Sequence, residues 1–273
     1  LVGSEMCIRD SLSAGRVQSV ALAELVHRYQ EYQAHEPKPF WTLTSEFQWD
    51  QTSLKTVLYT SKQNEKKVFE VSSEIQSLMK ALLKKTQWSL RFEMKTGKQN
   101  PSAPYSTSAL QQEVYEKYKI PAKQTMSIAQ TLYEQGLITY MRTDSVQLSE
   151  EAKKDIHTYL TEAFDESYVT DRSFKNKVAN AQEAHECIRP THFTTTVSEL
   201  PDALSPSHRK IYDLIWRKAV ASQMPAATMV HFHFYLSCDL KEFKGLDFRG
   251  NVSLVETLGY LEIWQPSQKV ETN

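Results

Sequence analysis

The sequence of 273 residues is poor in glycine and cysteine and nearly free of net charge, with 7 glycines, 3 cysteines and a formal charge of −1. The glycines are scattered, and the stretches that could form a phosphate-binding loop, such as residues 12–17, hold one glycine each. They match neither the dinucleotide-binding pattern nor the P-loop pattern, so we expect no Gly-rich nucleotide-binding loop. No run approaches the ~18 apolar residues that cross a bilayer, so we expect no transmembrane span. Aromatic residues make up 11% of the chain, which excludes wholesale disorder.

The cysteines, Cys7, Cys187 and Cys238, are odd in number and far apart. Without a Cys-x-x-Cys pair, neither a zinc ribbon nor a disulfide framework is supported. We expect free thiols in a reducing compartment, and no secretory signal is visible, so the predicted location is the cytoplasm. The near-neutral charge argues against binding nucleic acid by bulk electrostatics but leaves room for a local basic site.

Hydrophobic periodicity divides the chain into blocks of different character. Apolar residues near a 3.6-residue period predict helices, and strict alternation predicts strands. Alternation over residues 40–50 places Leu43, Ser45 and Phe47 on one face of a strand. The first block is expected to hold helices at 13–34 and 73–85, and strands at 40–50, 55–60, 67–71 and from Trp88 to Met94.

The middle of the chain is helical in pattern, and the end returns to strands. Gly136 is expected to end one helix with positive φ, Ser149 to cap another, and Ser205 with Pro206 to begin a third. Helices are predicted at 106–118, 122–135, 149–164 and 205–223, and strands at 230–240, 246–256 and 260–264. This order predicts an α+β fold in which a helical domain is inserted between two halves of one β-rich domain.

A tyrosine and an arginine follow the helix that ends at Gly136. Tyr140 and Arg142 are two residues apart in a segment predicted to be extended, so both side chains project from one face. A phenol can act as a covalent nucleophile, and a guanidinium fits phosphate oxygens, a combination suited to attack on a phosphodiester. By pattern alone, a tyrosine near an arginine is more often packing beside a surface charge.

Four segments, in order, resemble the type IA DNA topoisomerases. Residues 138–145 (ITYMRTDS) resemble the active-site segment in its bacterial topoisomerase I form. The start of a DNA-binding helix is resembled by residues 12–21 (LSAGRVQSVA), and the opening of the helical domain by residues 104–112 (PYSTSALQQ). A His-containing motif of the family is resembled by residues 181–191 (AQEAHECIRPT). The resemblance covers residues 12–264 and implies a β-rich arch with an inserted helical domain carrying the tyrosine.

The resemblance also implies roles for single residues. Tyr140 matches the nucleophile that forms a 5′-phosphotyrosine link, Arg142 the arginine that holds the scissile phosphate, and His185 a supporting histidine. Glu134, which shares a helix face with Gln130, is a candidate for proton handling. Arg189 is a candidate phosphate contact. A DNA-binding helix start is expected at Ser13, Ala14, Gly15, Arg16, Val17 and Gln18, where free backbone N–H groups favour an anion.

The sequence also departs from the family pattern. The magnesium-binding Toprim domain that precedes residue 12 in the family is absent, so Mg²⁺ is an implied cofactor whose ligands lie elsewhere, and we predict no metal site in this chain. Residues 1–11 do not continue the pattern, and Ala23 stands where many relatives carry a basic residue. The expected domains are 12–35, a partial DNA-binding domain; 36–99 and 226–273, the two parts of the arch; and 100–225, the helical active-site domain.

The sequence thus predicts a fragment of a topoisomerase that cleaves and reseals one DNA strand without ATP and is inactive alone. We expect single-stranded or negatively supercoiled DNA as its partner, a monomeric state, no membrane and association with the nucleoid. Met141 favours topoisomerase I over topoisomerase III or reverse gyrase, which usually place Pro or His there. A noncatalytic single-strand DNA-binding module and a plain structural scaffold remain alternatives, distinguished by covalent chemistry and by salt-dependent DNA binding.

Overall fold

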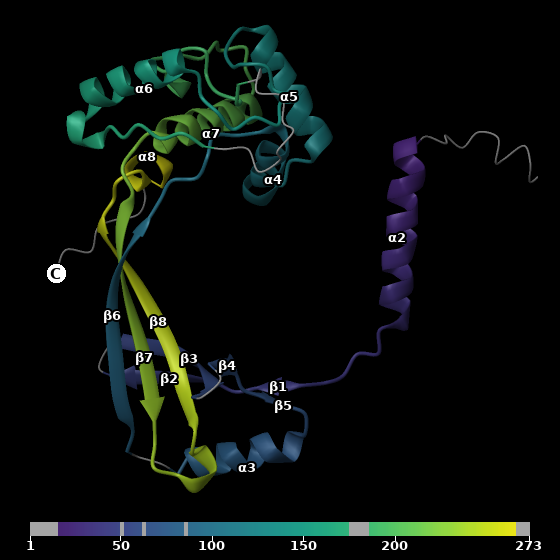
Figure 1. Cartoon of the computed structure of the whole chain (residues 1–273), viewed down its shortest axis with the longest axis vertical. Helices are drawn as coiled ribbons and strands as arrows, with labels where there is room; N and C mark the ends of the chain where they lie inside the picture. Colours follow the sequence, from purple (N-terminus) through teal and green to yellow (C-terminus); the bar gives the residue numbers. More distant parts are fainter. Residues whose placement is uncertain (1–15, 50–51, 62–63, 85–86, 175–185, 266–273) are drawn as a thin grey trace, which may run out of the picture. The chain divides into compact units, whose positions relative to one another are not determined.

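The chain forms two compact units with mixed helix and strand content, which confirms the α+β prediction (Figure 1). The first unit comprises Leu1–Ser89 and Ser237–Phe248, and the second comprises Leu90–Leu236 and Arg249–Asn273. The domain boundaries expected from the sequence remain predictions. The structure is a computed structural model that describes residues 16–49, 52–61, 64–84, 87–174 and 186–265.

The first unit contains most of the short strands. Strands β2 and β3 pair antiparallel in a register that runs from Thr44 opposite Val57 to Trp49 opposite Thr52, and β1 pairs antiparallel with β5. Its elements are α2 (Arg16–Ala34), β1 (Trp41–Thr42), β2 (Thr44–Trp49), β3 (Thr52–Thr60), β4 (Glu65–Lys66), β5 (Val68–Phe69), α3 (Ser72–Leu82) and the 3-10 turn η3 (Lys241–Phe243).

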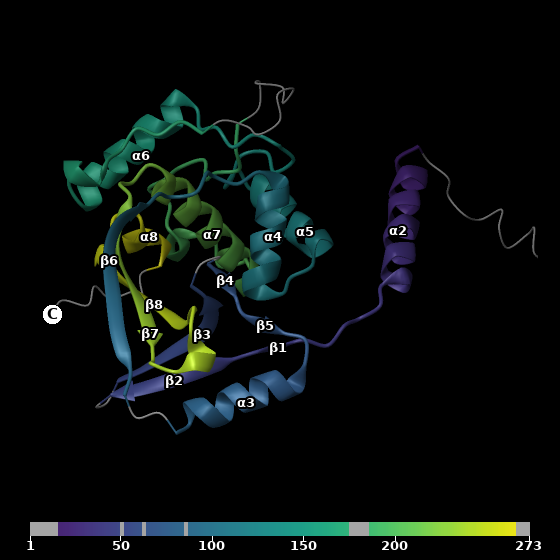
Figure 2. The same cartoon turned by 60° about the horizontal axis from the view of Figure 1, so that its bottom comes forward.

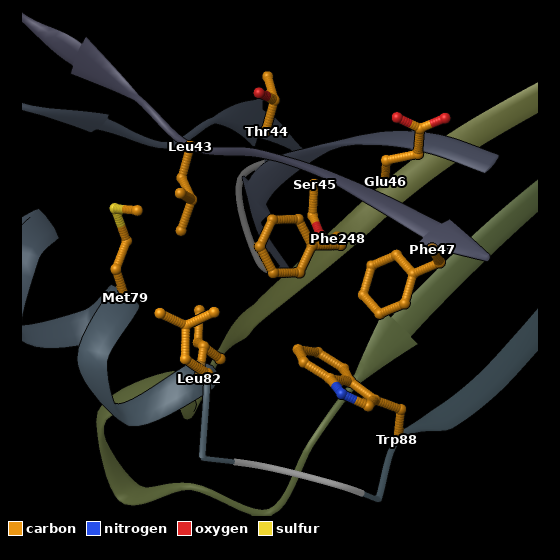
Figure 3. A pocket seen from close by; sticks show the side chains of 10 residues that line it. Leu43, Thr44, Ser45, Glu46, Phe47, Met79, Leu82, Trp88 and Phe248 are labelled. Atoms are coloured by element: carbon orange, nitrogen blue, oxygen red, sulfur yellow. The ribbon is translucent and has the colours of Figure 1, made fainter. Parts of the chain in front are cut away.

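Buried and exposed residues alternate from Leu43, between β1 and β2, into β2. Leu43 is buried and Ser45 and Phe47 are half-buried, while Thr44 and Glu46 between them are exposed, as the pattern predicts. The ring of Phe47 meets Trp88 and Phe248 at centroid distances of 4.9 and 5.8 Å. With Met79 and Leu82 from α3, these side chains line a pocket of about 300 Å³ (Figure 3).

Strands from both sides of the helical segment belong to one sheet, as expected for an inserted domain. The strand order is β2-β3-β8-β7-β6, and β4 pairs with β3. Strand β8 contributes its first residues, up to Phe248, to the first unit and the remainder to the second. The long strands are β6 (Ser89–Gln99), β7 (Ala227–Ser237) and β8 (Leu246–Thr257).

The predicted strand from Trp88 is confirmed in β6, yet its apolar face is not covered. Leu90, Phe92 and Met94 are more than half exposed. Alternation therefore predicted the backbone correctly. It did not show which face of the strand packs, because burial depends on what tertiary structure places against that face.

The second unit holds the helices from α4 to α8 (Figure 2). Helix α7 contacts α5 and α8, and α4 contacts α5. Trp216 of α7 contacts both apolar clusters of this unit and donates its indole N–H to the carbonyl of Phe193 at 2.9 Å. The elements are α4 (Thr107–Tyr118), α5 (Ala122–Glu134), α6 (Glu150–Ala163), η1 (Glu166–Tyr168), η2 (Val197–Glu199), α7 (Pro206–Ser222) and α8 (Leu261–Trp264).

The helix ends follow the local signals in the sequence. The hydroxyl of Ser149 accepts a hydrogen bond from the backbone N–H of Ala152 at 3.2 Å, and the Ser106 hydroxyl does the same for Ala109 at 3.5 Å. Gly136, just after α5, has φ of +70°. None of the helices in the described ranges is long and apolar enough to span a membrane.

The prediction of a strand at residues 260–264 is wrong, because Leu261–Trp264 is helix α8. Gly259 before it has φ of +49°, which turns the chain out of the β region, and the Tyr260 N–H donates to the Pro225 carbonyl at 2.9 Å. The alternation of Leu261 and Ile263 suggested a strand, but both are buried from a short helical turn.

Candidate active site

Tyr140 and Arg142 are exposed residues of an irregular segment between α5 and α6. Tyr140 is 47% exposed and Arg142 is exposed, whereas Met141 between them is 1% exposed. The alternation continues with buried Thr143 and exposed Asp144. The phenol and the guanidinium are thus both open to solvent, on either side of a buried residue. That they project from one side of the chain stays a prediction.

One side of this segment is bound to the beginning of α4. The hydroxyl oxygen of Thr107 lies 2.7 Å from the Met141 carbonyl oxygen and 3.0 Å from that of Thr143. The same hydroxyl accepts a hydrogen bond from the Thr143 N–H at 2.9 Å, and the Thr107 N–H donates to the Thr143 carbonyl at 2.8 Å. The backbone on both sides of Arg142 is therefore held by one residue.

The other side of the segment is bound to residues 187–191. Thr139 donates its backbone N–H to the Arg189 carbonyl at 2.8 Å and its hydroxyl to the Cys187 carbonyl at 2.8 Å. Ile138 forms an antiparallel bridge with Pro190. The backbone immediately before Tyr140 is thus fixed to the segment that contains the predicted His-containing motif.

The segments that begin α4 and that contain residues 187–191 are also bound to each other. The Ile188 N–H donates to the Tyr105 carbonyl at 2.8 Å, and the two residues form an isolated antiparallel bridge. Three of the four segments that carry the family resemblance, 104–112, 138–145 and 181–191, therefore meet around Tyr140 in the described residues. Their meeting is a tertiary property, since about 80 residues separate Tyr105 from Ile188 along the chain.

The ring of Tyr140 also contacts a residue that the sequence did not single out. Tyr133 of α5 meets it edge to face at a centroid distance of 5.4 Å. Glu134, the next residue, accepts a hydrogen bond from the Gln130 side chain at 2.7 Å, which confirms that these two share a helix face. The sequence signals Tyr133 only as an aromatic residue in the last turn of the helix that precedes Tyr140.

Arg189 is bound within the protein. Its guanidinium donates from Nε and Nη2 to the two carboxylate oxygens of Glu186, at 2.7 and 3.0 Å, and from Nη1 to the Pro190 carbonyl at 2.8 Å. All three nitrogens thus have acceptors, so this geometry does not favour the predicted phosphate contact. A fork-shaped pair of this kind is suited to holding the segment in place.

Glu186 in turn joins this segment to the beginning of α6. Its carboxylate accepts a hydrogen bond from the Ser149 N–H at 2.9 Å as well as those from Arg189. Partial burial alone would raise the pKa of Glu186, but the hydrogen bonds from Arg189 and from the Ser149 backbone outweigh burial and hold that pKa below its usual value.

Other predicted site residues lie in less fully described parts of the chain. His185, Ser13, Ala14 and Gly15 are outside the described residues. Arg16 is the first residue of α2, which also carries Val17 and Gln18. In the described part of the chain, no three His, Cys, Asp or Glu side chains are grouped to hold a metal ion.

Comparison with known proteins places this geometry in a family. The family model for DNA topoisomerase matches residues 3–273, a range that includes residues 3–11, which we expected to lie outside the family pattern. The chain is 35% identical over 268 residues to DNA topoisomerase 1 of Zymomonas mobilis, covering 96% of this chain and 21% of that protein. It is equally similar to DNA topoisomerase 1 of Rickettsia typhi, covering 93% of this chain and 34% of that protein.

The fold agrees with the sequence comparison. Full-length topoisomerase I from Thermotoga maritima superposes with a TM-score of 0.74 at 30% identity, covering 96% of this chain and 42% of that structure. The chain spans a fifth to a third of the length of the curated relatives named above. From the matching family model, the identities and the shared fold, we conclude that this chain belongs to the bacterial DNA topoisomerase family.

Proposed function

We propose that this chain supplies the nucleophile of a type IA topoisomerase, with Tyr140 attacking a phosphodiester of single-stranded DNA. The phenolic oxygen forms a bond to phosphorus while the bond from phosphorus to the 3′ oxygen breaks, and the phenol proton passes to that 3′ oxygen. The product is a 5′-phosphotyrosine and a free 3′ hydroxyl. Since one ester replaces another, the reverse reaction reseals the strand without ATP.

The observation that carries this proposal is the exposure of both Tyr140 and Arg142 on a segment whose backbone is bound on both sides. A guanidinium beside the phosphate would neutralise the charge that develops on its oxygens, and a positive neighbour also favours the phenolate. Both side chains are open to a ligand while the backbone beneath them is bound, so little reorganisation is needed for attack.

The complete protein is proposed to relax negatively supercoiled DNA as a monomer. Magnesium is proposed as a cofactor from the resemblance alone, because the described residues offer no cluster of ligands to hold it. Its ligands would belong to a Toprim domain, and no step assigned here to Tyr140 or Arg142 passes through the ion.

The proposal is tested with the complete topoisomerase that contains this sequence as its central region. After incubation with an end-labelled oligonucleotide, a denaturing gel should show a covalent adduct that Tyr140→Phe abolishes with little loss of DNA binding. Tyr133→Phe, which removes a neighbouring hydroxyl, is the matched control and should keep the adduct. An adduct that persists in Tyr140→Phe would overturn the proposal, and binding without any adduct would favour the noncatalytic alternative.

A second substitution tests the role of Arg142. Arg142→Lys keeps the charge but loses the planar fork, so the cleavage rate should fall by about 10²–10³-fold. Lys123→Arg, a conservative exchange at an exposed position of α5, is the control and should leave the cleavage rate unchanged. An unchanged rate for Arg142→Lys would show that the guanidinium geometry is not used.

A further inference from the structure

Two threonine hydroxyls hold the backbone on either side of the exposed pair. Thr107 binds the carbonyls of Met141 and Thr143 and the N–H of Thr143, at distances of 2.7–3.0 Å. Thr139 donates to the Cys187 carbonyl at 2.8 Å and accepts from the Arg189 N–H at 3.0 Å. Both hydroxyls act as donor and acceptor at once, which no apolar side chain of the same shape can do.

These bonds matter because the segment between them has no regular secondary structure. From residue 139 to residue 149 the chain is neither helix nor strand. Its backbone N–H and C=O groups therefore depend on partners from elsewhere in the unit. Met141 and Thr143 are buried at 1% and 8% exposure, so the Met141 carbonyl and the Thr143 N–H would lose a buried partner if Thr107 lost its hydroxyl. The Thr143 carbonyl would keep the hydrogen bond from the Thr107 N–H.

We infer that Thr107 is a positioning residue that fixes the direction of Tyr140 and Arg142 for attack on the phosphate, a role that rests on the function proposed above. Its hydroxyl binds the peptide groups that precede and follow Arg142, so it sets the orientation of that side chain through the backbone. Thr139, the residue before Tyr140, is itself bound to the backbone of Cys187 and Arg189 through its hydroxyl. Neither threonine needs to touch the DNA for this role, since it acts through the chain it holds.

The first test is spectroscopic and uses this chain. The chain contains 13 tyrosines, so they are replaced by 3-fluorotyrosine and the ¹⁹F resonance of Tyr140 is assigned as the one missing in Tyr140→Phe. In Thr107→Val that resonance should shift and broaden, and in Thr107→Ser it should stay at its original position. Thr125→Val is the matched control, because the buried Thr125 hydroxyl binds the Pro121 carbonyl at 3.2 Å on another helix.

The second test separates binding from cleavage in the complete topoisomerase. Thr107→Val should lower the single-turnover cleavage rate by up to about 10²-fold, the effect of a displacement near 1 Å, while the Kd for the oligonucleotide stays nearly constant. Thr107→Ser should recover most of the rate. Thr125→Val should lower the unfolding temperature without lowering the cleavage rate.

The remaining outcomes overturn the inference. An unmoved Tyr140 resonance, an unchanged cleavage rate in Thr107→Val, or equal losses in Thr107→Val and Thr125→Val would each contradict a positioning role. If Thr107→Val does not fold by circular dichroism, Thr107 is structural and the inference is wrong. If Tyr140→Phe still cleaves DNA, the proposed function fails, whereas normal cleavage by Thr107→Val beside inactive Tyr140→Phe overturns only this inference.

Discussion

The ring of Tyr133 meets the ring of Tyr140 edge to face, with an interplanar angle of 66° and centroids 5.4 Å apart. Tyr133 belongs to helix α5, while Tyr140 lies on the irregular segment that follows Gly136. The rings are 41% and 47% exposed, so solvent reaches both of them. Tyr133, which is held by helix α5, therefore packs against the proposed nucleophile and limits the orientations of the Tyr140 ring.

This contact predicts that Tyr133→Ala slows cleavage several-fold, because the Tyr140 ring loses its neighbour. An aromatic pair contributes ~0.5–1.5 kcal/mol, and exposure places this one near the lower end. Tyr133→Phe keeps the ring and should keep the rate in a single-turnover cleavage assay. Equal losses in both variants would show that the Tyr133 hydroxyl, and not ring packing, is what matters.

DNA binding at the beginning of α2 is tested through its salt dependence. Arg16→Ala should weaken binding of single-stranded DNA and reduce the slope of log K against log salt by about 0.7, the value for one lost phosphate contact. Arg28→Ala on the same helix is the control, since Arg28 pairs with Glu31 at 2.6 Å. A slope that is the same for both variants and the parent chain would contradict a phosphate contact at Arg16.

The pKa of Glu186 predicts how stability depends on pH. Because hydrogen bonds lower this pKa in the folded chain, the stabilisation is fully present above the unfolded value of about 4.5 and is lost as pH falls through the folded pKa. Glu186→Gln should therefore lower the unfolding temperature at neutral pH, and the difference from the parent chain should shrink in acid.

Thermal unfolding followed by circular dichroism between pH 3 and pH 7, roughly the range in which carboxylates titrate, measures this difference. Glu162→Gln, which alters an exposed carboxylate on α6, is the control and should give a small difference at every pH. A constant gap between Glu186→Gln and the parent chain across this range would contradict the linkage.

Glycine substitutions test the turn that replaces the expected strand. A Cβ at Gly259 would lie 2.6 Å from the carbonyl oxygens of Pro225 and Ala226, and its φ is positive. Gly136 also has positive φ, but a Cβ there would meet nothing within 4 Å. Gly136→Ala should cost ~1–2 kcal/mol of unfolding free energy from backbone strain alone, and Gly259→Ala should cost clearly more in urea titrations. Equal costs would contradict the clash.

The local elements could be predicted because their signals are short in range. Ser106 and Ser149 cap helices, Pro206 begins one and Gly136 follows the end of another, each by a backbone rule that neighbouring residues satisfy. The strand expected at 260–264 was wrong because a two-residue alternation over so short a stretch does not distinguish a strand from one helical turn.

The site could be predicted only in part, for the same physical reason. Backbone alternation predicts a shared face for Tyr140 and Arg142, and both residues are exposed on either side of buried Met141. The contacts of Thr107 and Thr139 join segments 34 to 50 residues apart, and no spacing in the sequence specifies such pairs. Likewise, the pairing of Arg189 with Glu186 could not be distinguished from a free guanidinium by pattern alone.

The most direct test of the central claim is to locate the DNA-linked residue by mass spectrometry. The complete topoisomerase containing this sequence is trapped on an oligonucleotide, digested with protease and nuclease, and the peptide carrying a nucleotide is sequenced. We predict that the added mass lies on Tyr140 within residues 138–142 and is attached through a 5′ phosphate. A nucleotide on any other residue, Tyr133 included, would contradict the assignment of the nucleophile.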